Sequence, residues 1–205
     1  MTRQLTRTAP ARTIRAGLGL VLGASLLLGC SSGDGGDDAS GTDAGSDGTA
    51  TEGIEGVETE RVGDYVHALG DLDYPVPAPS GGDHSPPPYW LTCAVYEGQV
   101  PDELAVHSLE HGAIWIALGP DSTPADRETA IALAAGRKVF VSDVTDLPDP
   151  VELVAWGFRL RIDSADDPRA DAFIEAFIDA DTAPEPGASC ESLGDPPNPP
   201  ELPTS

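Results

Sequence analysis

The chain has 205 residues, and its 11 basic and 35 acidic side chains give a formal net charge of −24 at pH 7. A chain this acidic is not expected to bind nucleic acid by neutralising phosphates, or an anionic membrane surface by charge, but it can attract cations, above all metal ions. With 20 prolines and 23 glycines beside 40% apolar residues, disordered and folded parts are expected in separate stretches, and the length favours one domain.

The first 29 residues have the composition of an export signal. Residues 1–15 hold four arginines and no acid, and residues 16–28 form an uncharged apolar run that is too short to span a bilayer. The run leads through Leu27-Leu28-Gly29 to Cys30, an order that resembles the bacterial lipobox, in which the cysteine is lipidated and becomes the mature N-terminus. The resemblance implies export to the bacterial cell envelope and a lipid anchor of fatty acyl chains such as palmitate, at the outer membrane if the cell has one. The alternative is an ordinary signal peptide with a chance cysteine.

Both flanks of the central region are predicted to lack a packed core. Residues 30–60 are expected to form a disordered tether, because residues 31–60 hold nine acids and no base, with one Ile and one Val as their only large apolar side chains. Residues 182–205 hold seven prolines and no apolar period, so an irregular tail is expected there. A single globular domain is therefore predicted over residues 61–181.

The central region alternates strand and helix patterns. A short strand is expected at residues 65–69, followed by a long loop at 71–88, where six prolines remove backbone donors. Helices are expected at residues 101–111, 122–135 and 167–180, each beginning at or near a proline. Apolar runs at 113–118, 138–141, 151–156 and 158–162 predict strands. This order predicts an α+β fold, with one small mixed β-sheet and about three helices packed on it.

Two cysteines remain after Cys30. In a protein exported to an oxidising compartment, Cys93 and Cys190 are expected to form one disulfide that joins the tail to the domain. The competing interpretation keeps Cys93 as a thiolate ligand for a soft metal.

The four histidines are the most informative residues of the chain. His107 and His111 lie four positions apart on an expected helix, so both side chains project from one face, as in helical zinc sites. Glu110, between them, can serve as a ligand or as an acceptor that orients a ligating histidine. His84 in the proline-rich loop and His67 upstream complete a candidate site for copper or zinc, since imidazole suits both metals. The alternative is a set of imidazoles that hydrogen-bond loop carbonyls without a metal.

The same spacing also fits a hydrolase motif. Residues 107–111 read H-S-L-E-H and satisfy H-x-x-E-H, in which both histidines bind zinc and the glutamate is the general base. Glu110 would then activate a metal-bound water. Glu185 is the only candidate for the additional glutamate of such proteases.

Several short motifs occur in an order found in a bacterial family. They are Gly82-Asp83-His84, Val100-Pro101-Asp102-Glu103, Val106-His107-Ser108-Leu109-Glu110-His111-Gly112 and Ala155-Trp156-Gly157. Together they resemble the family catalogued as domain of unknown function 3105, over about residues 61–186. The resemblance implies that His67, His84, His107, Glu110 and His111 are the site residues, and that the protein is exported or membrane-tethered. It implies no activity.

Three functions follow from these patterns. The first and preferred one is a non-catalytic lipoprotein of the cell envelope that binds copper or zinc. The second is a metal-dependent hydrolase with Glu110 as base, and the third is a structural or interaction module in which the histidines hold the loop on the helix. The expected partner is the membrane, through the lipid anchor; nucleic acid is excluded by charge, and the sequence identifies no protein partner. Trp90, Trp115 and Trp156 are expected to be core or rim anchors.

Overall fold

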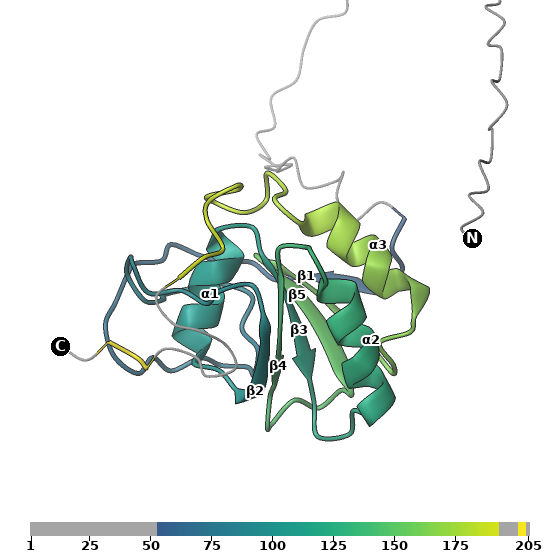
Figure 1. Ribbon diagram of the computed structural model, residues 1–205. Helices are drawn as coiled ribbons and strands as arrows, with labels where there is room; N and C mark the ends of the chain where they lie inside the picture. Colours follow the sequence, from purple (N-terminus) through teal and green to yellow (C-terminus); the bar gives the residue numbers. More distant parts are fainter. Residues whose placement is uncertain (1–52, 193–200, 204–205) are drawn as a thin grey trace, which may run out of the picture. The chain divides into compact units, whose positions relative to one another are not determined.

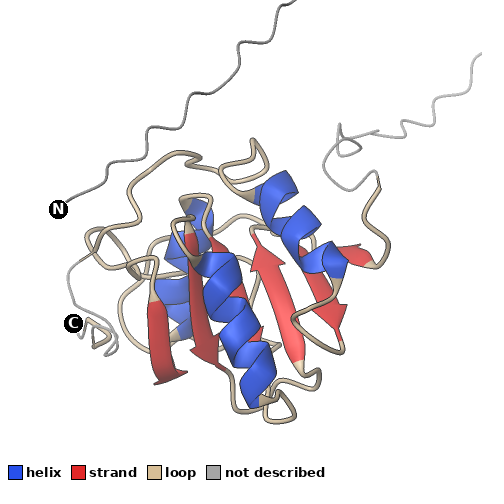
Figure 2. Cartoon of the chain, turned by 45° about the vertical axis from the view of Figure 1, so that its right-hand side comes forward, coloured by secondary structure: helices blue, strands red, loops and turns tan. Residues whose placement is uncertain are grey.

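Six strands form one mixed β-sheet with helices on both of its faces (Figures 1 and 2). The computed structural model describes residues 53–192 and 201–203. The expected signal, Cys30 and most of the expected tether lie outside the described residues. No helix within the described part of the chain is long and apolar enough to cross a bilayer.

The sheet combines parallel and antiparallel pairs. Its strands are β1 (Val57–Thr59), β2 (Val95–Gln99), β3 (Ile114–Leu118), β4 (Val139–Asp143), β5 (Val151–Ala155) and β6 (Phe158–Ile162), in the order β1-β6-β5-β3-β4-β2. β4 is parallel to both β2 and β3, whereas β5, β6 and β1 pair in antiparallel fashion. The helices are α1 (Asp102–Glu110), α2 (Pro124–Ala134) and α3 (Pro168–Phe177). The predicted α+β fold with one mixed sheet and three helices is confirmed.

The composition of β3 explains why helices cover both faces. Ile114, Ile116 and Leu118 pack in an apolar layer with α2 and α3, whereas Trp115 and Ala117 pack in a second layer with α1. Successive residues of a strand point to opposite faces, so a strand that is apolar at every position requires cover on both sides. α1 therefore lies on the face opposite α2 and α3 (Figure 1).

Residues 53–60 belong to the folded domain, so the predicted tether is wrong for this stretch. β1 pairs with β6 through the main chain. Two of the acids that indicated disorder form ion pairs with β6: Glu58 with Arg161 at 2.5 Å and Glu60 with Arg159 at 2.7 Å. A three-residue strand held in this way needs no apolar pattern, which is why composition alone missed it.

Two other elements differ from the prediction. The strand expected at residues 65–69 is reduced to one isolated bridge between His67 and His84. β2, which was not predicted, is the strand at the other edge of the sheet, and only Tyr96 within it is fully buried, so it lacks an apolar run. Residues 182–192 form neither helix nor strand.

Candidate metal centre

α1 carries the candidate ligands His107 and Glu110, its C-cap residue is His111, and the helix is almost entirely buried. A proline precedes its first turn, which contains two acids, an arrangement that favours a helix start. The helix is followed by Gly112, whose φ of +87° suits glycine, and a Cβ here would lie 2.9 Å from Cα of Asp179. All residues from 103 to 110 are buried. His107, Glu110 and His111 are thus presented by a helix that is fixed in the core.

The other two histidines reach α1 through a bridge between distant segments. The N–H of His84 donates to the carbonyl of Val66 at 3.3 Å, and the N–H of Ala68 donates to the carbonyl of His84 at 2.8 Å. This pairing places His67 beside His84, with ring centroids 4.7 Å apart. Both rings also lie against His107, at 5.4 and 5.1 Å. The proline-rich loop and the segment before it therefore meet over the helix.

The carboxylate of Glu110 lies among three imidazoles. Its Oε2 atom is 3.0 Å from Nε2 of His84, 3.5 Å from Nε2 of His67 and 3.9 Å from Nε2 of His107. The side chain of His67 is 38% exposed, whereas the other three are at most 3% exposed. We call these four residues together with His111 the histidine cluster. It is a buried polar site that reaches the surface at His67.

A backbone carbonyl fixes the proton position of His84. Nδ1 of His84 lies 2.8 Å from the carbonyl oxygen of Gly82, and because a carbonyl only accepts, Nδ1 carries the proton. Nε2 is then the atom that faces Glu110. Two states satisfy this contact: a cationic imidazole that donates to the carboxylate, or a neutral imidazole whose Nε2 lone pair binds a cation held jointly with Glu110. Metal-binding histidines commonly have this arrangement, with the second nitrogen on a carbonyl.

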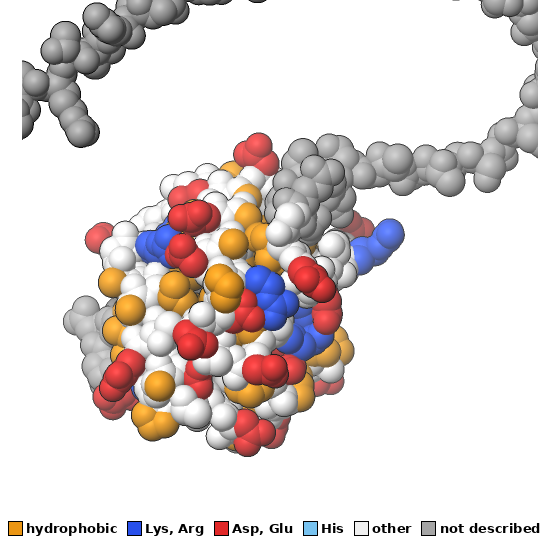
Figure 3. All heavy atoms as spheres, turned by 90° about the vertical axis from the view of Figure 1, so that its right-hand side faces the viewer, with side chains coloured by type: hydrophobic (Ala, Val, Ile, Leu, Met, Phe, Trp, Pro, Cys, Tyr) orange, Lys and Arg blue, Asp and Glu red, His pale blue; other side chains and the backbone are white. Residues whose placement is uncertain are grey.

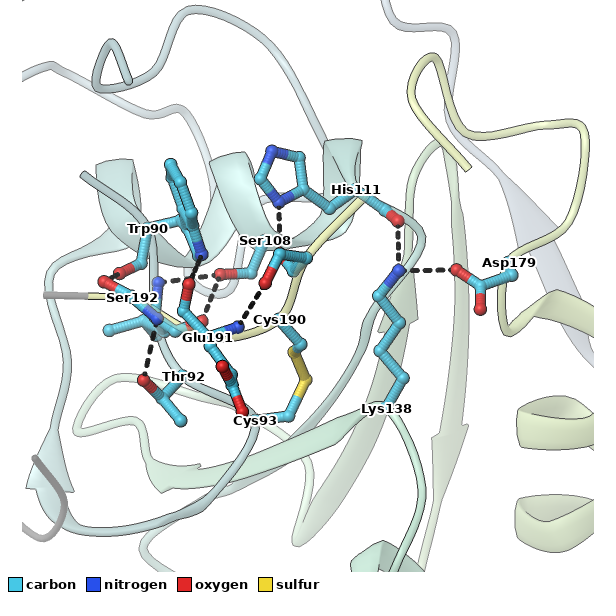
Figure 4. The surroundings of a disulfide bond; sticks show 12 residues. Trp90, Thr92, Cys93, Ser108, His111, Lys138, Asp179, Cys190, Glu191 and Ser192 are labelled. Carbon is cyan, nitrogen blue, oxygen red and sulfur yellow. Dashed lines mark hydrogen bonds and ion pairs between the residues drawn. A yellow bond between two sulfur atoms is a disulfide. The ribbon is translucent and has the colours of Figure 1, made fainter. Parts of the chain in front are cut away.

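A second carbonyl orients His111 in the same way. Nδ1 of His111 donates to the carbonyl of Ser189 at 2.8 Å, which leaves Nε2 available to bind a ligand. Nε2 lies 3.7 Å from Oε2 of Glu185. The backbone oxygen of His111 accepts a hydrogen bond from Nζ of Lys138 at 2.7 Å (Figure 4). Both the ring and the backbone of His111 are therefore held in place.

A disulfide attaches the C-terminal segment beside His111 (Figure 4). It joins Cys93 to Cys190, whose Cα atoms are 5.4 Å apart, and the N–H of Cys93 donates to the carbonyl of Cys190 at 3.0 Å. Because the bond uses both sulfur atoms, Cys93 is not a thiolate ligand in this structure.

The electrostatic balance favours an ionised glutamate beside a neutral histidine. Burial acts to raise the pKa of Glu110, but the hydrogen bond to His84 and the charge of the neighbouring imidazoles outweigh it and lower that pKa to about 2. For His107, burial and repulsion from the other imidazoles lower the pKa to about 4. Nδ1 of His107 is buried without a hydrogen bond of normal geometry, although the backbone of Ser85 lies close to the ring. At neutral pH, His107 is uncharged and offers a lone pair.

Aromatic side chains line the histidine cluster. Trp90 packs against His111 with ring centroids 4.8 Å apart, and Tyr65 packs against His84 at 5.4 Å. Burial and a hydrogen bond to Glu110 raise the pKa of the Tyr65 hydroxyl to about 12. Aromatic side chains in these positions limit the access of water to the site and so strengthen the electrostatic interactions inside it.

The spacing of the donor atoms suits a small cation. Ligands bound about 2.0–2.1 Å from a tetrahedral zinc ion lie about 3.3 Å from one another. The three contacts between Glu110 Oε2 and imidazole Nε2 atoms, from 3.0 to 3.9 Å, bracket that value. Two overlapping sets each offer donor atoms within 4.8 Å of one another: His67, His84 and His107, and His107, Glu110 and His111. Ligand type and spacing thus both fit a transition metal ion.

The five residues singled out from the sequence lie together in space. Helical spacing anticipated the pair on α1, but no local pattern encodes the bridge that brings His67 and His84 to it. Glu185 reaches His111 from beyond α3. The carbonyls of Gly82 and Ser189 had no sequence signal, because every residue has a carbonyl. Trp115 and Trp156 are buried as expected, and Trp90 is half-buried. Both Trp90 and Trp156 line the cluster, against His111 and His84 respectively.

Comparison with known proteins identifies one family. The family model described as Protein of unknown function (DUF3105) matches residues 66–192. The matched region contains the whole histidine cluster and both disulfide cysteines. No curated protein and no solved structure matches the chain.

Proposed function

The chain belongs to the family described as Protein of unknown function (DUF3105), and we propose that its histidine cluster binds a copper or zinc ion. The observation that carries this proposal is the position of Oε2 of Glu110, which lies 3.0–3.9 Å from three imidazole nitrogens in a buried site. Burying several polar side chains together is unfavourable unless each is compensated. A metal ion bound by these nitrogens and the carboxylate compensates them together.

The donor set supports copper(II) or zinc over softer ions. Imidazole and carboxylate suit both metals, whereas copper(I) is best held by thiolates and thioethers. Met1 is the only methionine of the chain, and the two cysteines of the described region are joined in a disulfide. The acidic chain also raises the local concentration of cations. On the face drawn in Figure 3, Asp and Glu side chains are spread widely and Lys and Arg occur in small groups.

Metal binding is favoured over the hydrolase alternative by the state of Glu110. A general base works best when its pKa lies near the working pH. The pKa of Glu110 is lowered to about 2, so its carboxylate is a weak base at neutral pH. It also contacts the imidazoles directly, as a ligand of the same ion does. We therefore assign Glu110 the role of ligand or counter-charge.

We propose further that the protein acts at the bacterial cell envelope, anchored by lipid on Cys30. The basic and apolar start of the chain and the order Leu27-Leu28-Gly29-Cys30 support this. The disulfide between Cys93 and Cys190 fits an oxidising compartment. Labelled palmitate should be incorporated into the full chain and not into Cys30→Ser; equal labelling of both contradicts the anchor.

Elemental analysis of the tag-free full chain tests metal binding. Metal-free protein is incubated with zinc or copper(II) and desalted, and about one ion per chain is expected to remain. His107→Ala and Glu110→Ala are expected to lose it, whereas Asp121→Asn, an exposed acid away from the cluster, keeps it. Only trace metal in the unmodified chain contradicts the proposal. So do alanine variants that lose thermal stability equally with and without chelator, the result that a purely structural role requires.

A further inference from the structure

Residues 189–192, here called the strap, contact two side chains at one edge of the histidine cluster. The carbonyl of Ser189 accepts the Nδ1 proton of His111 at 2.8 Å, and the carbonyl of Glu191 accepts the indole proton of Trp90 at 2.9 Å. The hydroxyl of Ser192 donates to the carbonyl of Trp90. Figure 4 shows these bonds gathered around the disulfide. The strap therefore orients one proposed ligand and the aromatic ring that packs against it.

The strap depends on the disulfide for its position. It contains no helix or strand, and the side chains of Ser189 and Glu191 are exposed. Cys190 lies inside the strap and is bonded to Cys93, which lies 97 positions earlier in the chain. A short exposed segment held by a few hydrogen bonds opens readily. The covalent bond is what keeps the Ser189 carbonyl against His111.

Loss of the Ser189 carbonyl has a specific consequence for His111. Its ring, which packs against His107 with centroids 4.7 Å apart, would be free to rotate, and Nε2 would no longer be the nitrogen left free of the Ser189 carbonyl. Removing the hydrogen-bond partner that orients a ligating histidine typically lowers metal affinity 10–100-fold.

We propose that the Cys93–Cys190 disulfide is a positioning element of the histidine cluster, and that the oxidised chain binds metal more tightly than the reduced chain. This inference rests on the proposed metal binding and adds redox regulation to the same site. The switching reaction is thiol–disulfide exchange with a dithiol. The dithiol gives two electrons and two protons and becomes a cyclic disulfide, and Cys93 and Cys190 become thiols.

The test is a thermodynamic cycle in the full chain carrying Cys30→Ser, so that only Cys93 and Cys190 can pair. Metal-free protein is titrated with zinc, and separately with copper(II), against a chromogenic chelator. The oxidised chain is compared with Cys93→Ser/Cys190→Ser, which lacks both the bond and the thiols that could themselves bind metal. The same pair is then compared in a His111→Ala background. Affinity is expected to fall 10–100-fold without the disulfide when His111 is present, and not to fall further when His111 is absent.

Each other outcome has a defined meaning. Equal affinity with and without the disulfide overturns the inference and leaves the proposed metal binding intact. The same loss in the His111→Ala background also overturns it, because the bond then acts through general stability. An oxidised chain that binds neither metal overturns the proposed function itself, and the inference with it.

A second variant covers the case in which the cysteine-free chain does not fold. Ser192→Pro keeps the disulfide but removes the hydroxyl bonded to Trp90 and the N–H that donates to Thr92 Oγ1 at 3.2 Å. Because the disulfide still holds the strap, metal affinity is expected to be unchanged; a loss of affinity that depends on His111 would show that these hydrogen bonds, and not the disulfide, position the ring, and overturns the inference. Asp126→Ala, on the opposite face of the sheet, controls for lost stability and should leave affinity unchanged.

Discussion

Nε2 of His84 lies 3.0 Å from Oε2 of Glu110, and both side chains are withdrawn from solvent. His84 belongs to the proline-rich loop and Glu110 to α1, so this contact joins the loop to the helix. A metal ion bound here would replace a shared proton between two groups that already face each other. Metal binding at this contact would therefore release one proton and require little rearrangement of the backbone.

The histidines are expected to contribute unequally to metal affinity. His84→Ala and His107→Ala should abolish tight binding, because both rings are buried and held by their surroundings. His67→Ala should weaken binding less, since His67 is 38% exposed and water can take its place as a ligand. Competition against a chelator gives the three affinities. A larger loss for His67→Ala than for His84→Ala would contradict the ligand assignment.

Glu110→Ala is expected to destabilise the metal-free protein by about 1–3 kcal/mol, because it leaves Nε2 of the buried His84 without its acceptor. Glu110→Gln retains an acceptor oxygen for His84 and should destabilise the metal-free protein less than Glu110→Ala does. Urea unfolding of the chelator-treated full chain measures both. Similar losses for the two variants would show that the carboxylate contributes through its charge and not through the hydrogen bond.

Asp126 is expected to make stability depend on pH in acid. Its carboxylate accepts hydrogen bonds from Ser164 and Thr123 and from the N–H of Ala165, and these bonds hold its pKa below the ordinary value of 3.8. The folded state therefore binds fewer protons than the unfolded state, so this stabilisation is complete above pH 3.8 and is lost as the pH falls toward the folded pKa. Asp126→Asn should lower the free energy of unfolding by about 1–3 kcal/mol at pH 7.

Measuring the free energy of unfolding at several pH values supplies the control for this prediction. The difference in unfolding free energy between Asp126→Asn and the unmodified chain should narrow between pH 4 and about pH 2. A difference that is constant over this range would mean that the ionised carboxylate is not what stabilises the start of α2.

The disulfide is expected to stabilise the fold as well as position the strap. Cys93 and Cys190 are 97 residues apart, and closing a loop of about 100 residues stabilises a protein by about 4–5 kcal/mol. Guanidinium unfolding of the Cys30→Ser chain, with and without Cys93→Ser/Cys190→Ser, measures this contribution. A loss below about 1 kcal/mol would indicate that the tail is held by its other contacts, or that the reduced unfolded state retains structure.

Local patterns were sufficient to predict the three helices and four of the six strands. The start of α2 illustrates why: Thr123 and Asp126 form a reciprocal capping box around Pro124, and all three features can be recognised in the sequence. The fully apolar β3 likewise implies a strand buried on both faces. β1 and β2 were not predicted because both lie at the edges of the sheet: β1 is held by main-chain pairing and by the ion pair of Glu58 with Arg161, and only Tyr96 is fully buried in β2.

The candidate site was only partly predictable for a related reason. The spacing of His107 and His111 fixes their shared face as soon as a helix is assumed. The position of His67 depends on the backbone bridge to His84, and the orientation of His111 depends on a carbonyl 78 positions away. Contacts between distant backbone groups do not depend on residue type, so they cannot be predicted from a sequence motif and are seen only in the folded chain.

β1 also determines where a fragment of the chain must begin if it is to remain soluble. A fragment that begins at residue 61, the boundary that composition suggests, keeps the whole histidine cluster but deprives β6 of its outer neighbour. It also removes Glu60, the carboxylate that pairs with the buried Arg159. An uncovered strand is a template for other chains, so this fragment is expected to self-associate. Poor solubility of such a fragment would reflect its open sheet edge and would carry no information about metal binding.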